Sequence, residues 1–344
     1  MSKPAKVREF FRVIGEAASV LPALNYRIAA DDEKVSLGSV FEDSVSRYPD
    51  NTMLIFEGRQ WTYTEFNSEV NRFARVMTSK GVNRGDTVAL LMENRAEYAL
   101  AMLAAVKLGA SCSLINNSLS GAGLVHCIKA THGIACIVGE ERTEVLDEVR
   151  GELGLEEGAG YFWFADNKQS PKPDWALDAK TEMEGMFAHN LEVTREVTAG
   201  ENALYIFTSG TTGLPKEAVV LHRKILAASQ GMGRIGFKLK PKDRLYLCLP
   251  IYHITGMGPG FCGFICSGGS IVLRRSFSAS KFWPEVREHK ANCFIYVGEL
   301  CRYLSMRSTC AGHVANTTSC WTGISIRKLS LATRVTSDPS PAIP

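Results

Sequence analysis

From about residue 36 onward, apolar runs of strand length alternate with segments of helical periodicity. DTVALLME and IACIVG have the composition of buried strands, whereas AEYALAMLAAVKLG and GAGLVHCIKATHG have the length and spacing of helices. Because neighbouring parallel strands are connected through helices, this alternation predicts an α/β fold. The alternation occurs on both sides of a polar stretch at 151–200, so we expect two layered β-α-β subdomains.

Individual elements follow from the same patterns. We expect a helix from residue 36 that ends at Pro49, a hairpin around Glu57-Gly58, and a helix from about Thr64 to Gly81, with Thr64 and Asn67 as an approximate capping pattern. Residues 151–200 are expected to be irregular. Further elements are expected in NALYIFTSG, DRLYLCLP, SIVLRR and ANCFIYVGE as strands, and in RKILAASQGMG and SASKFWPEVREHK as helices.

The composition changes after about Leu304. The remaining residues are rich in serine and threonine, contain a single acidic residue, and show neither helical nor strand periodicity. We therefore divide the chain into an N-terminal segment (1–35), a folded domain (36–304) and a disordered or aberrant tail (305–344).

The N-terminal segment combines apolar residues at helical spacing with lysines and arginines over residues 3–21. Such a helix favours either docking on its own domain or a peripheral contact with an anionic membrane surface. No segment reaches the roughly 20 uninterrupted apolar residues that a spanning helix needs. We expect a cytoplasmic protein, with the inner face of a membrane as the alternative location.

Charge and cysteine spacing exclude several functional classes. The net charge is only +3 and no long basic run occurs, so a nucleic-acid partner is not expected. The 10 cysteines form no C-x-x-C pair and most lie in apolar surroundings. This pattern favours buried reduced thiols over disulfides, and we expect no metal site built from histidine and cysteine.

The stretch YIFTSGTTGLPK (205–216) is an apolar strand that runs into glycines, hydroxyl side chains, a proline and one lysine. Glycines let the backbone approach a ligand closely, and concave arrays of backbone N–H groups bind anions. The spacing differs from the Walker motif. A dinucleotide-type motif at Gly231, Gly233 and Gly236 follows a helix rather than a strand, which argues against that function. The sequence therefore predicts a polyphosphate site after Phe207.

YIFTSGTTGLPK resembles the phosphate-loop signature of the AMP-binding, adenylate-forming enzymes, the acyl-CoA synthetase superfamily. WTYTEFN (61–67), AMLAAVKLGASCSLINNSL (101–119) and LPIYHITG (249–256) resemble other segments of that family, in the same order. LINNSLSGAGLVHCI and YVGELCRYL are similar to the fatty acid transport protein branch, the very long-chain acyl-CoA synthetases. The resemblance covers about residues 36–304.

The resemblance implies ATP-dependent activation of long-chain or very long-chain fatty acids to acyl-CoA through an acyl-adenylate, in some relatives coupled to fatty acid uptake. ATP, Mg²⁺ and CoA would be the co-substrates. It implies that His253 lines the acyl pocket near the reacting phosphate, although a core histidine is the alternative from the residue alone. Gly298 and Glu299 would shape the acyl and CoA passage. The residues implied in phosphate binding are Thr208, Ser209, Gly210, Thr211, Thr212, Gly213 and Lys216.

Two departures from the family pattern limit what is expected of this chain. Glu217 stands where the family has a small residue, and its carboxylate would repel phosphates unless it points away or meets the metal. The family's adenine-stacking segment, ribose-binding aspartate and C-terminal lid with its lysine have no counterpart, which predicts a truncation or frame shift after about residue 304. We therefore expect little or no acyl-CoA formation by this chain alone. A non-catalytic nucleotide- or acyl-binding module is the alternative.

Overall fold

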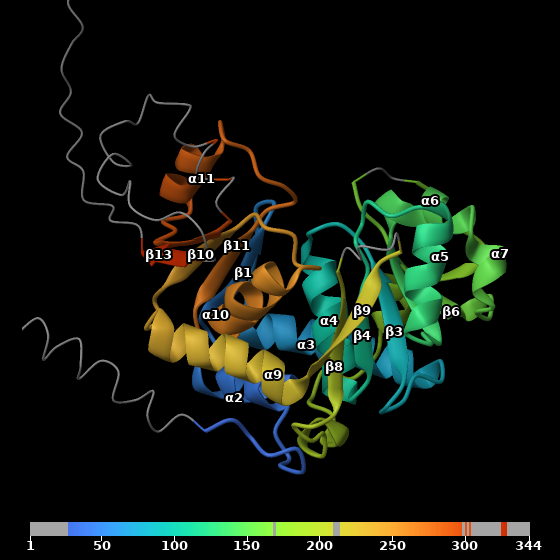
Figure 1. Cartoon of the computed structure of the whole chain (residues 1–344), viewed down its shortest axis with the longest axis horizontal. Helices are drawn as coiled ribbons and strands as arrows, with labels where there is room; N and C mark the ends of the chain where they lie inside the picture. The colour runs from blue at the N-terminus through green and yellow to red at the C-terminus, as the bar shows by residue number, and fades with distance from the viewer. Residues whose placement is uncertain are drawn as a thin grey trace, which may run out of the picture.

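Two β-sheets stand next to each other and organise the molecule (Figure 1). The computed structural model describes residues 27–167, 170–208, 214–297, 300, 303 and 325–328. In spatial order, the seven-stranded sheet consists of β7 (Ala176–Asp178), β6 (Gly158–Phe164), β5 (Ala135–Gly139), β3 (Thr87–Leu91), β4 (Ser111–Leu114), β8 (Asn202–Thr208) and β9 (Lys216–Leu221). Neighbouring strands are parallel except for β9, which runs antiparallel to β8.

The six-stranded sheet has a parallel centre and antiparallel edges. Its strands, in spatial order, are β13 (Ser325–Lys328), β12 (Cys293–Tyr296), β10 (Arg244–Leu247), β11 (Ser270–Leu273), β1 (Thr52–Phe56) and β2 (Arg59–Thr62). The hairpin expected around Glu57-Gly58 joins β1 to β2, and both turn residues have positive φ (45° and 85°). β13 lies within the predicted tail, and the rest of 305–344 falls outside the described residues.

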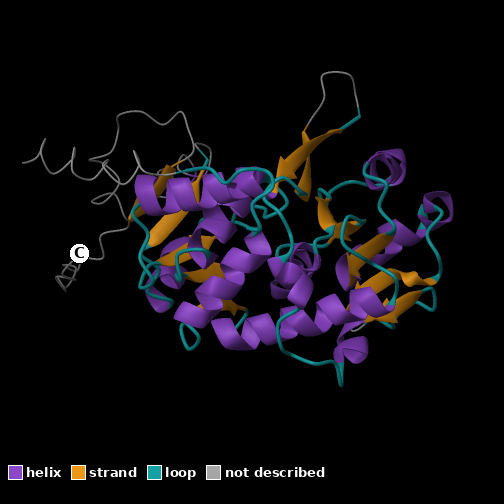
Figure 2. Cartoon of the chain, turned by 90° about the horizontal axis from the view of Figure 1, so that it is seen from below, coloured by secondary structure: helices purple, strands orange, loops and turns teal. Residues whose placement is uncertain are grey.

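Helices lie between the two groups of strands as well as outside them (Figure 2). The α-helices are α2 (Leu37–Arg47), α3 (Tyr63–Ser79), α4 (Ala96–Leu108), α5 (Gly121–Ala130), α6 (Thr143–Asp147), α7 (Arg150–Leu153), α8 (Ala179–Met183), α9 (His222–Leu226), α10 (Gly263–Ile265) and α11 (Phe282–Glu288). The described residues also form two 3₁₀-helices, η1 (Glu140–Arg142) and η2 (Glu192–Arg195), and two π-helices, η3 (Ala227–Gly236) and η4 (Gly256–Cys262).

The core divides into two clusters, one on each face of the seven-stranded sheet. α3 and α4 pack in the larger cluster, which also contains side chains from the six-stranded sheet. α4 is apolar on nearly all sides, and a helix with that composition must be buried on all sides. α5 covers the opposite face of the seven-stranded sheet within the smaller cluster. This arrangement confirms the α/β fold that the sequence predicts.

The start of α3 corrects one expectation. The helix is capped by Thr62 rather than Thr64: the hydroxyl of Thr62 accepts from Glu65 N (3.1 Å), and the Glu65 carboxylate accepts from Thr62 N (2.8 Å). Asn67 takes no part in the cap, because its side chain is bonded to Asn190 and Lys107. A glutamate at the third helical position completes a capping box, which an asparagine at 67 does not do here.

A second correction concerns residues 151–200, expected to be irregular. β6 occupies part of this stretch and pairs in parallel with β5 on one side and β7 on the other. Its residues 160–164 are buried, and the edge of Tyr161 packs against Trp175 with ring centroids 5.1 Å apart. The alternation of α/β units therefore continues through this region, although its helical connections are short.

His222, the first residue of α9, is buried and accepts a hydrogen bond at Nδ1 from Leu37 N (3.1 Å). Burial lowers the pKa of this imidazole to about 4, below its ordinary value of about 6.5. Between these two pH values the unfolded chain binds a proton that the folded chain excludes. Stability must therefore fall as the pH is lowered through this window, by about 2 kcal/mol at pH 5.

We expect His222→Gln to remove most of this acid sensitivity, because an amide oxygen also accepts from Leu37 N but does not titrate. Urea unfolding at pH 7 and pH 5 measures the difference, with His189→Gln at an exposed position as the control. Equal acid sensitivity in wild type and His222→Gln would contradict the prediction.

Candidate active site

The carboxyl ends of the parallel strands form one edge of the seven-stranded sheet. β4 lies on one side of β3 and β5 on the other, so the chain reverses its direction across the sheet at this point. The crossover helices after β3 and β4 lie on opposite faces, since α4 packs in the larger core cluster and α5 in the smaller one. In open α/β sheets, ligands bind outside the carboxyl ends of the strands at such a reversal.

The predicted phosphate loop follows β8 at this edge. Thr208 ends β8 and Lys216 begins β9; the two residues pair across the hairpin, and the Thr208 hydroxyl donates to the Lys216 carbonyl at 3.4 Å. Both side chains are exposed. On the other side, His126 Nε2 of α5 lies 3.0 Å from the Pro215 carbonyl and holds the hairpin against that helix. The remaining predicted phosphate-binding residues, Ser209, Gly210, Thr211, Thr212 and Gly213, lie outside the described residues.

Lys216 and Glu217 point to opposite faces of the sheet, because successive side chains of a strand alternate. Glu217 pairs with Phe207, which packs in the smaller cluster beside α5. Burial raises the pKa of the Cys127 thiol in α5 to about 11, and the negative charge of Glu217 adds to this rise, so the carboxylate lies on the α5 side. Lys216 shares its face with Val220, which packs against the larger cluster. The carboxylate is thus directed away from the side on which the lysine lies.

His253 comes from the six-stranded sheet, in the turn after β10. Its backbone N donates to the Pro250 carbonyl (3.3 Å), and its carbonyl accepts from Met257 N (2.9 Å) at the start of η4. The imidazole ring lies 4.5 Å from the Tyr252 ring, and its other side is exposed. Partial burial lowers the pKa of His253, so the ring is neutral at pH 7. It is not a core histidine.

Gly256 keeps the turn around His253 closed. A Cβ atom at this position would lie 2.4 Å from the Pro250 carbonyl oxygen. Because this oxygen is a backbone atom, relieving the clash would require the whole turn to shift. We expect Gly256→Ala to lower the free energy of unfolding by about 1–3 kcal/mol, the usual cost of overpacking. Chemical denaturation measures it. In the control, Gly123→Ala on α5 meets only an ordinary contact of 3.7 Å and should be neutral or stabilising; similar losses in both variants would refute the steric argument.

Asn94 is a residue of this edge that the sequence analysis missed. It follows β3, is buried, and its side chain is bonded to the segments that follow β10 and β11. The signal that could have identified it is its place: a polar residue just after a buried strand lies at the ligand-binding edge.

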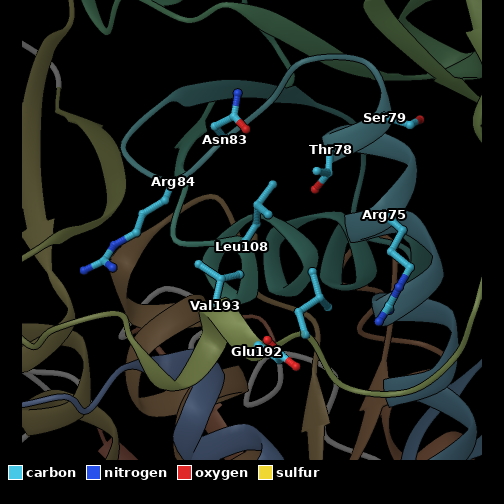
Figure 3. Close-up of a pocket in the computed structure, with 9 residues that line it drawn as sticks. Arg75, Thr78, Ser79, Asn83, Arg84, Leu108, Glu192 and Val193 are labelled. Atoms are coloured by element: carbon cyan, nitrogen blue, oxygen red, sulfur yellow. The ribbon is translucent and has the colours of Figure 1, made fainter.

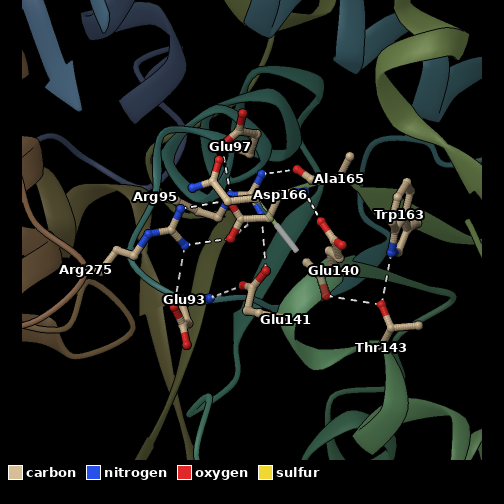
Figure 4. Close-up of polar contacts among 12 residues, drawn as sticks. Glu93, Arg95, Glu97, Glu140, Glu141, Thr143, Trp163, Ala165, Asp166 and Arg275 are labelled. Atoms are coloured by element: carbon tan, nitrogen blue, oxygen red, sulfur yellow. Dashed lines mark hydrogen bonds and ion pairs between the residues drawn. The ribbon is translucent and has the colours of Figure 1, made fainter. Parts of the chain in front are cut away.

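Charged side chains lie around the segment that follows β3 and contains Asn94 (Figure 4). Asp166, after β6, accepts two hydrogen bonds of 2.7 Å from the Arg275 guanidinium, after β11, and lies 3.5 Å from Arg95 Nη1. Arg95 also pairs with Glu141, after β5, at 3.2 Å. Ion pairs of this kind with little exposure fix geometry through charge-assisted hydrogen bonds. The carboxyl ends of strands from both sheets are thereby held together.

Tyr98, in the first turn of α4, carries a fully buried hydroxyl that has no hydrogen-bond partner among the described residues. Burial raises its pKa, with Cys112 and Tyr252 adding to the rise, so this hydroxyl lies near the residue that precedes His253. A buried polar group of this kind needs an explanation, such as a water molecule or a ligand group.

Not all of the other predicted features fall on described residues. Gly298, Glu299 and the segment at 3–21 lie outside the described residues. The dinucleotide-type glycines at 231, 233 and 236 lie in the π-helix η3, not in a strand-to-helix turn. Within the described part of the chain, no group of three histidine, cysteine, aspartate or glutamate side chains is placed to hold a metal ion. The described cysteines are buried, and none of them is joined to another in a disulfide. No helix among the described residues is long and apolar enough to cross a membrane.

A cavity of about 710 Å³ lies away from the carboxyl edge of the seven-stranded sheet (Figure 3). Its lining comes from the last turns of α3 and α4, from the loop before β3 at the amino-terminal edge of the seven-stranded sheet, and from residues 191–193 at the start of η2. The lining includes Arg75, Thr78, Ser79, Asn83, Arg84 and Leu108. The cavity is therefore separate from the predicted phosphate loop.

A family model and several known proteins match this chain. The family model described as AMP-binding enzyme matches residues 41–331, which overlap the predicted domain at 36–304 and extend into the predicted tail. The chain is 36% identical over 282 residues to the medium/long-chain-fatty-acid–CoA ligase FadD6 of Mycobacterium tuberculosis, covering 82% of this chain and 45% of that protein. It is 34% identical over 292 residues to the very long-chain fatty acid transport protein of Cochliobolus heterostrophus, covering 84% and 43%.

Solved structures show the same fold. The anthranilate CoA ligase AuaEII in complex with anthranoyl-AMP superposes with a TM-score of 0.74 at 19% identity, over 85% of this chain and 54% of that one. A Mycobacterium tuberculosis fatty acyl CoA synthetase gives a TM-score of 0.68 at 22% identity, over 82% and 53%. The chain spans less than half the length of the two sequence relatives. It belongs to the AMP-binding, adenylate-forming enzyme family, and fatty acid–CoA ligases and fatty acid transport proteins are among its relatives.

Proposed function

We propose that this chain carries the ATP- and fatty-acid-binding part of a long-chain or very long-chain fatty acid–CoA ligase that forms AMP. The observation that carries the proposal is that Asn94, at the carboxyl edge of the sheet that contains β8, is hydrogen-bonded to the turn that carries His253 after β10. Relatives named as a fatty acid–CoA ligase and as a very long-chain fatty acid transport protein support the choice of a fatty acid as the substrate.

The proposed reaction has two steps. A carboxylate oxygen of the fatty acid attacks the α-phosphorus of ATP, and the bond to the bridging oxygen breaks, releasing pyrophosphate. The CoA sulfur then attacks the acyl carbonyl carbon, its proton passes to solvent, and AMP leaves. In-line attack by one anion on another depends on positioning and on neutralisation of charge.

The chain's own residues would supply that positioning. Lys216 would neutralise the β- and γ-phosphates, with Thr208, Ser209, Gly210, Thr211, Thr212 and Gly213 around them. Glu217 points to the opposite face and so would not repel the phosphates. His253 is neutral, and its exposed edge would line the carboxyl end of the acyl pocket. Mg²⁺ would enter with ATP as part of the substrate, and we assign no residue of this chain to it.

Calorimetry and pyrophosphate release together test this proposal. ATP is expected to bind the 344-residue chain, and palmitate is expected to bind in addition; no binding of ATP would overturn the proposal. Release of pyrophosphate that depends on palmitate separates a catalytic chain from a module that only binds nucleotide and acyl chain. We also propose a peripheral membrane contact through residues 3–21 and a cytoplasmic location. Gly298 and Glu299 are proposed to lie at the CoA passage.

A further inference from the structure

The polar atoms of the Asn94 side chain all bond to the other sheet. Nδ2 donates to the Leu249 carbonyl at 2.8 Å and to the Arg274 carbonyl at 3.2 Å, and Oδ1 accepts from Ile251 N at 3.0 Å. The side chain is almost fully buried, with 4% of its surface exposed. A buried amide with donors and acceptor all satisfied holds its surroundings in one arrangement, because every displacement leaves a buried polar group unpaired.

Two of these hydrogen bonds hold the turn that carries His253 in place. Leu249 and Ile251 lie on either side of Pro250, whose carbonyl accepts from His253 N at 3.3 Å. The Leu249 carbonyl and the Ile251 amide lie in a connection between elements, where no strand supplies partners for them. Asn94 provides these partners from the segment just after β3, a strand that neighbours β4 and, through it, β8.

The residues on either side of Asn94 are themselves fixed to the seven-stranded sheet (Figure 4). Glu93 N donates to Glu141 Oε1 at 2.7 Å, Arg95 pairs with the other oxygen of Glu141 at 3.2 Å, and Arg95 also donates to the Ala165 carbonyl. The backbone at position 94 is thus anchored to the ends of β5 and β6. Movement of the His253 turn relative to the seven-stranded sheet would have to break the Asn94 bonds.

We propose that Asn94 is a positioning residue that sets the place of His253 relative to the carboxyl edge of the seven-stranded sheet; this inference rests on the function proposed above. Its amide joins the seven-stranded sheet to the turn that, in the proposed function, would face the acyl carboxylate. Because reaction depends on placing the carboxylate oxygen in line with the α-phosphorus, a shift of about 1 Å in such a turn costs up to about 100-fold in rate.

The variant that tests this is Asn94→Ala, with Asn71→Ala as the matched control. Asn71 is equally buried and also donates to a backbone carbonyl, that of Ala188 (2.7 Å), but it lies beside Lys107, remote from the His253 turn. Both variants should lose stability. Only Asn94→Ala should change the titration of the His253 imidazole. This difference separates a positioning role from a purely structural one.

The first readout is the His253 imidazole titration by NMR on chain labelled at its 7 histidines, with His253→Gln to assign the signal. In Asn94→Ala the pKa of His253 is expected to rise toward its ordinary value of about 6.5, because the turn loosens into solvent. The His222 signal should stay unchanged. A His253 titration identical in wild type, Asn94→Ala and Asn71→Ala would overturn the inference.

The second readout is binding of a non-hydrolysable palmitoyl-adenylate analogue, an acyl sulfamoyl adenosine. Asn94→Ala should bind it about tenfold more weakly, while the affinity for ATP changes less than about twofold. Equal losses for both probes would also count against the inference. If the analogue does not bind wild type, the proposed function fails, and the NMR titration still decides the role of Asn94. If Asn94→Ala does not fold, Asn94→Asp, which keeps the acceptor but cannot donate, is judged by the same titration.

Discussion

Replacing Lys107 with alanine is expected to lower the free energy of unfolding by about 3–5 kcal/mol, the cost of removing one partner of a buried ion pair. Lys107 is fully buried in α4, and its Nζ lies 2.9 Å from the Glu42 carboxylate. Burial lowers its pKa to about 8, while Glu42 acts against this shift, so the amine is still charged at pH 7.

The loss is large because several buried groups depend on this one amine. Lys107 Nζ also donates to the side-chain oxygens of Asn67 (2.7 Å), Asn71 (2.6 Å) and Asn190 (3.0 Å). Without the lysine, Glu42 keeps one ion-pair partner among the described residues, the partly exposed Arg195, whose Nε lies 3.0 Å from the carboxylate. Of the groups left unpaired, Glu42, Asn67 and Asn71 are buried between α2, α3 and α4, where water cannot easily replace the amine, whereas Asn190 is exposed.

Urea unfolding at pH 7 measures this loss, and Lys129→Ala at an exposed position of α5 is the matched control, with an expected change below about 0.5 kcal/mol. The double variant Lys107→Met with Glu42→Gln should recover part of the loss, because no charge is then left unpaired. A loss below 1 kcal/mol for Lys107→Ala would show that the cluster adds little to stability.

Lys216→Ala is expected to weaken ATP binding by about 10- to 100-fold, which corresponds to the 1.5–3 kcal/mol of a hydrogen bond to a charged group. Lys216 is exposed at the start of β9, directly after the predicted phosphate loop, on the face of the sheet that looks toward the larger core cluster. AMP lacks the β- and γ-phosphates, so its affinity should change little. Calorimetric titration with ATP and with AMP measures both effects.

Glu217→Gln is the matched control for Lys216→Ala, because it changes the charge of the next residue on the opposite face of the same strand. Its effect on ATP affinity should stay within about threefold, which is the effect of a remote charge screened by solvent and salt. If Glu217→Gln strengthened ATP binding tenfold, or if Lys216→Ala weakened ATP and AMP equally, Lys216 would not contact the outer phosphates.

Local patterns predicted much of the fold, because helical and strand periodicity report burial without any knowledge of partners. α4 is an example: its continuous apolar sequence predicts a helix enclosed on all sides, and it is buried between the two sheets. β6 shows the limit of the same method. Its aromatic run stands among polar residues that predict irregular structure, and only pairing with β5 and β7 makes it a strand.

At the candidate site too, some residues can be identified from the sequence, whereas the relations between others depend on the tertiary structure. The sequence by itself determined the strand-then-glycine pattern before Lys216 and the resemblance of the His253 segment, because both are contiguous and carry their chemistry locally. Only the tertiary structure decided that Glu217 faces away from Lys216, and that Asn94 holds the turn of His253, 155 residues away at Leu249. Pairing between distant strands sets those relations, and no periodicity within a single segment records which distant backbone group a side chain will meet.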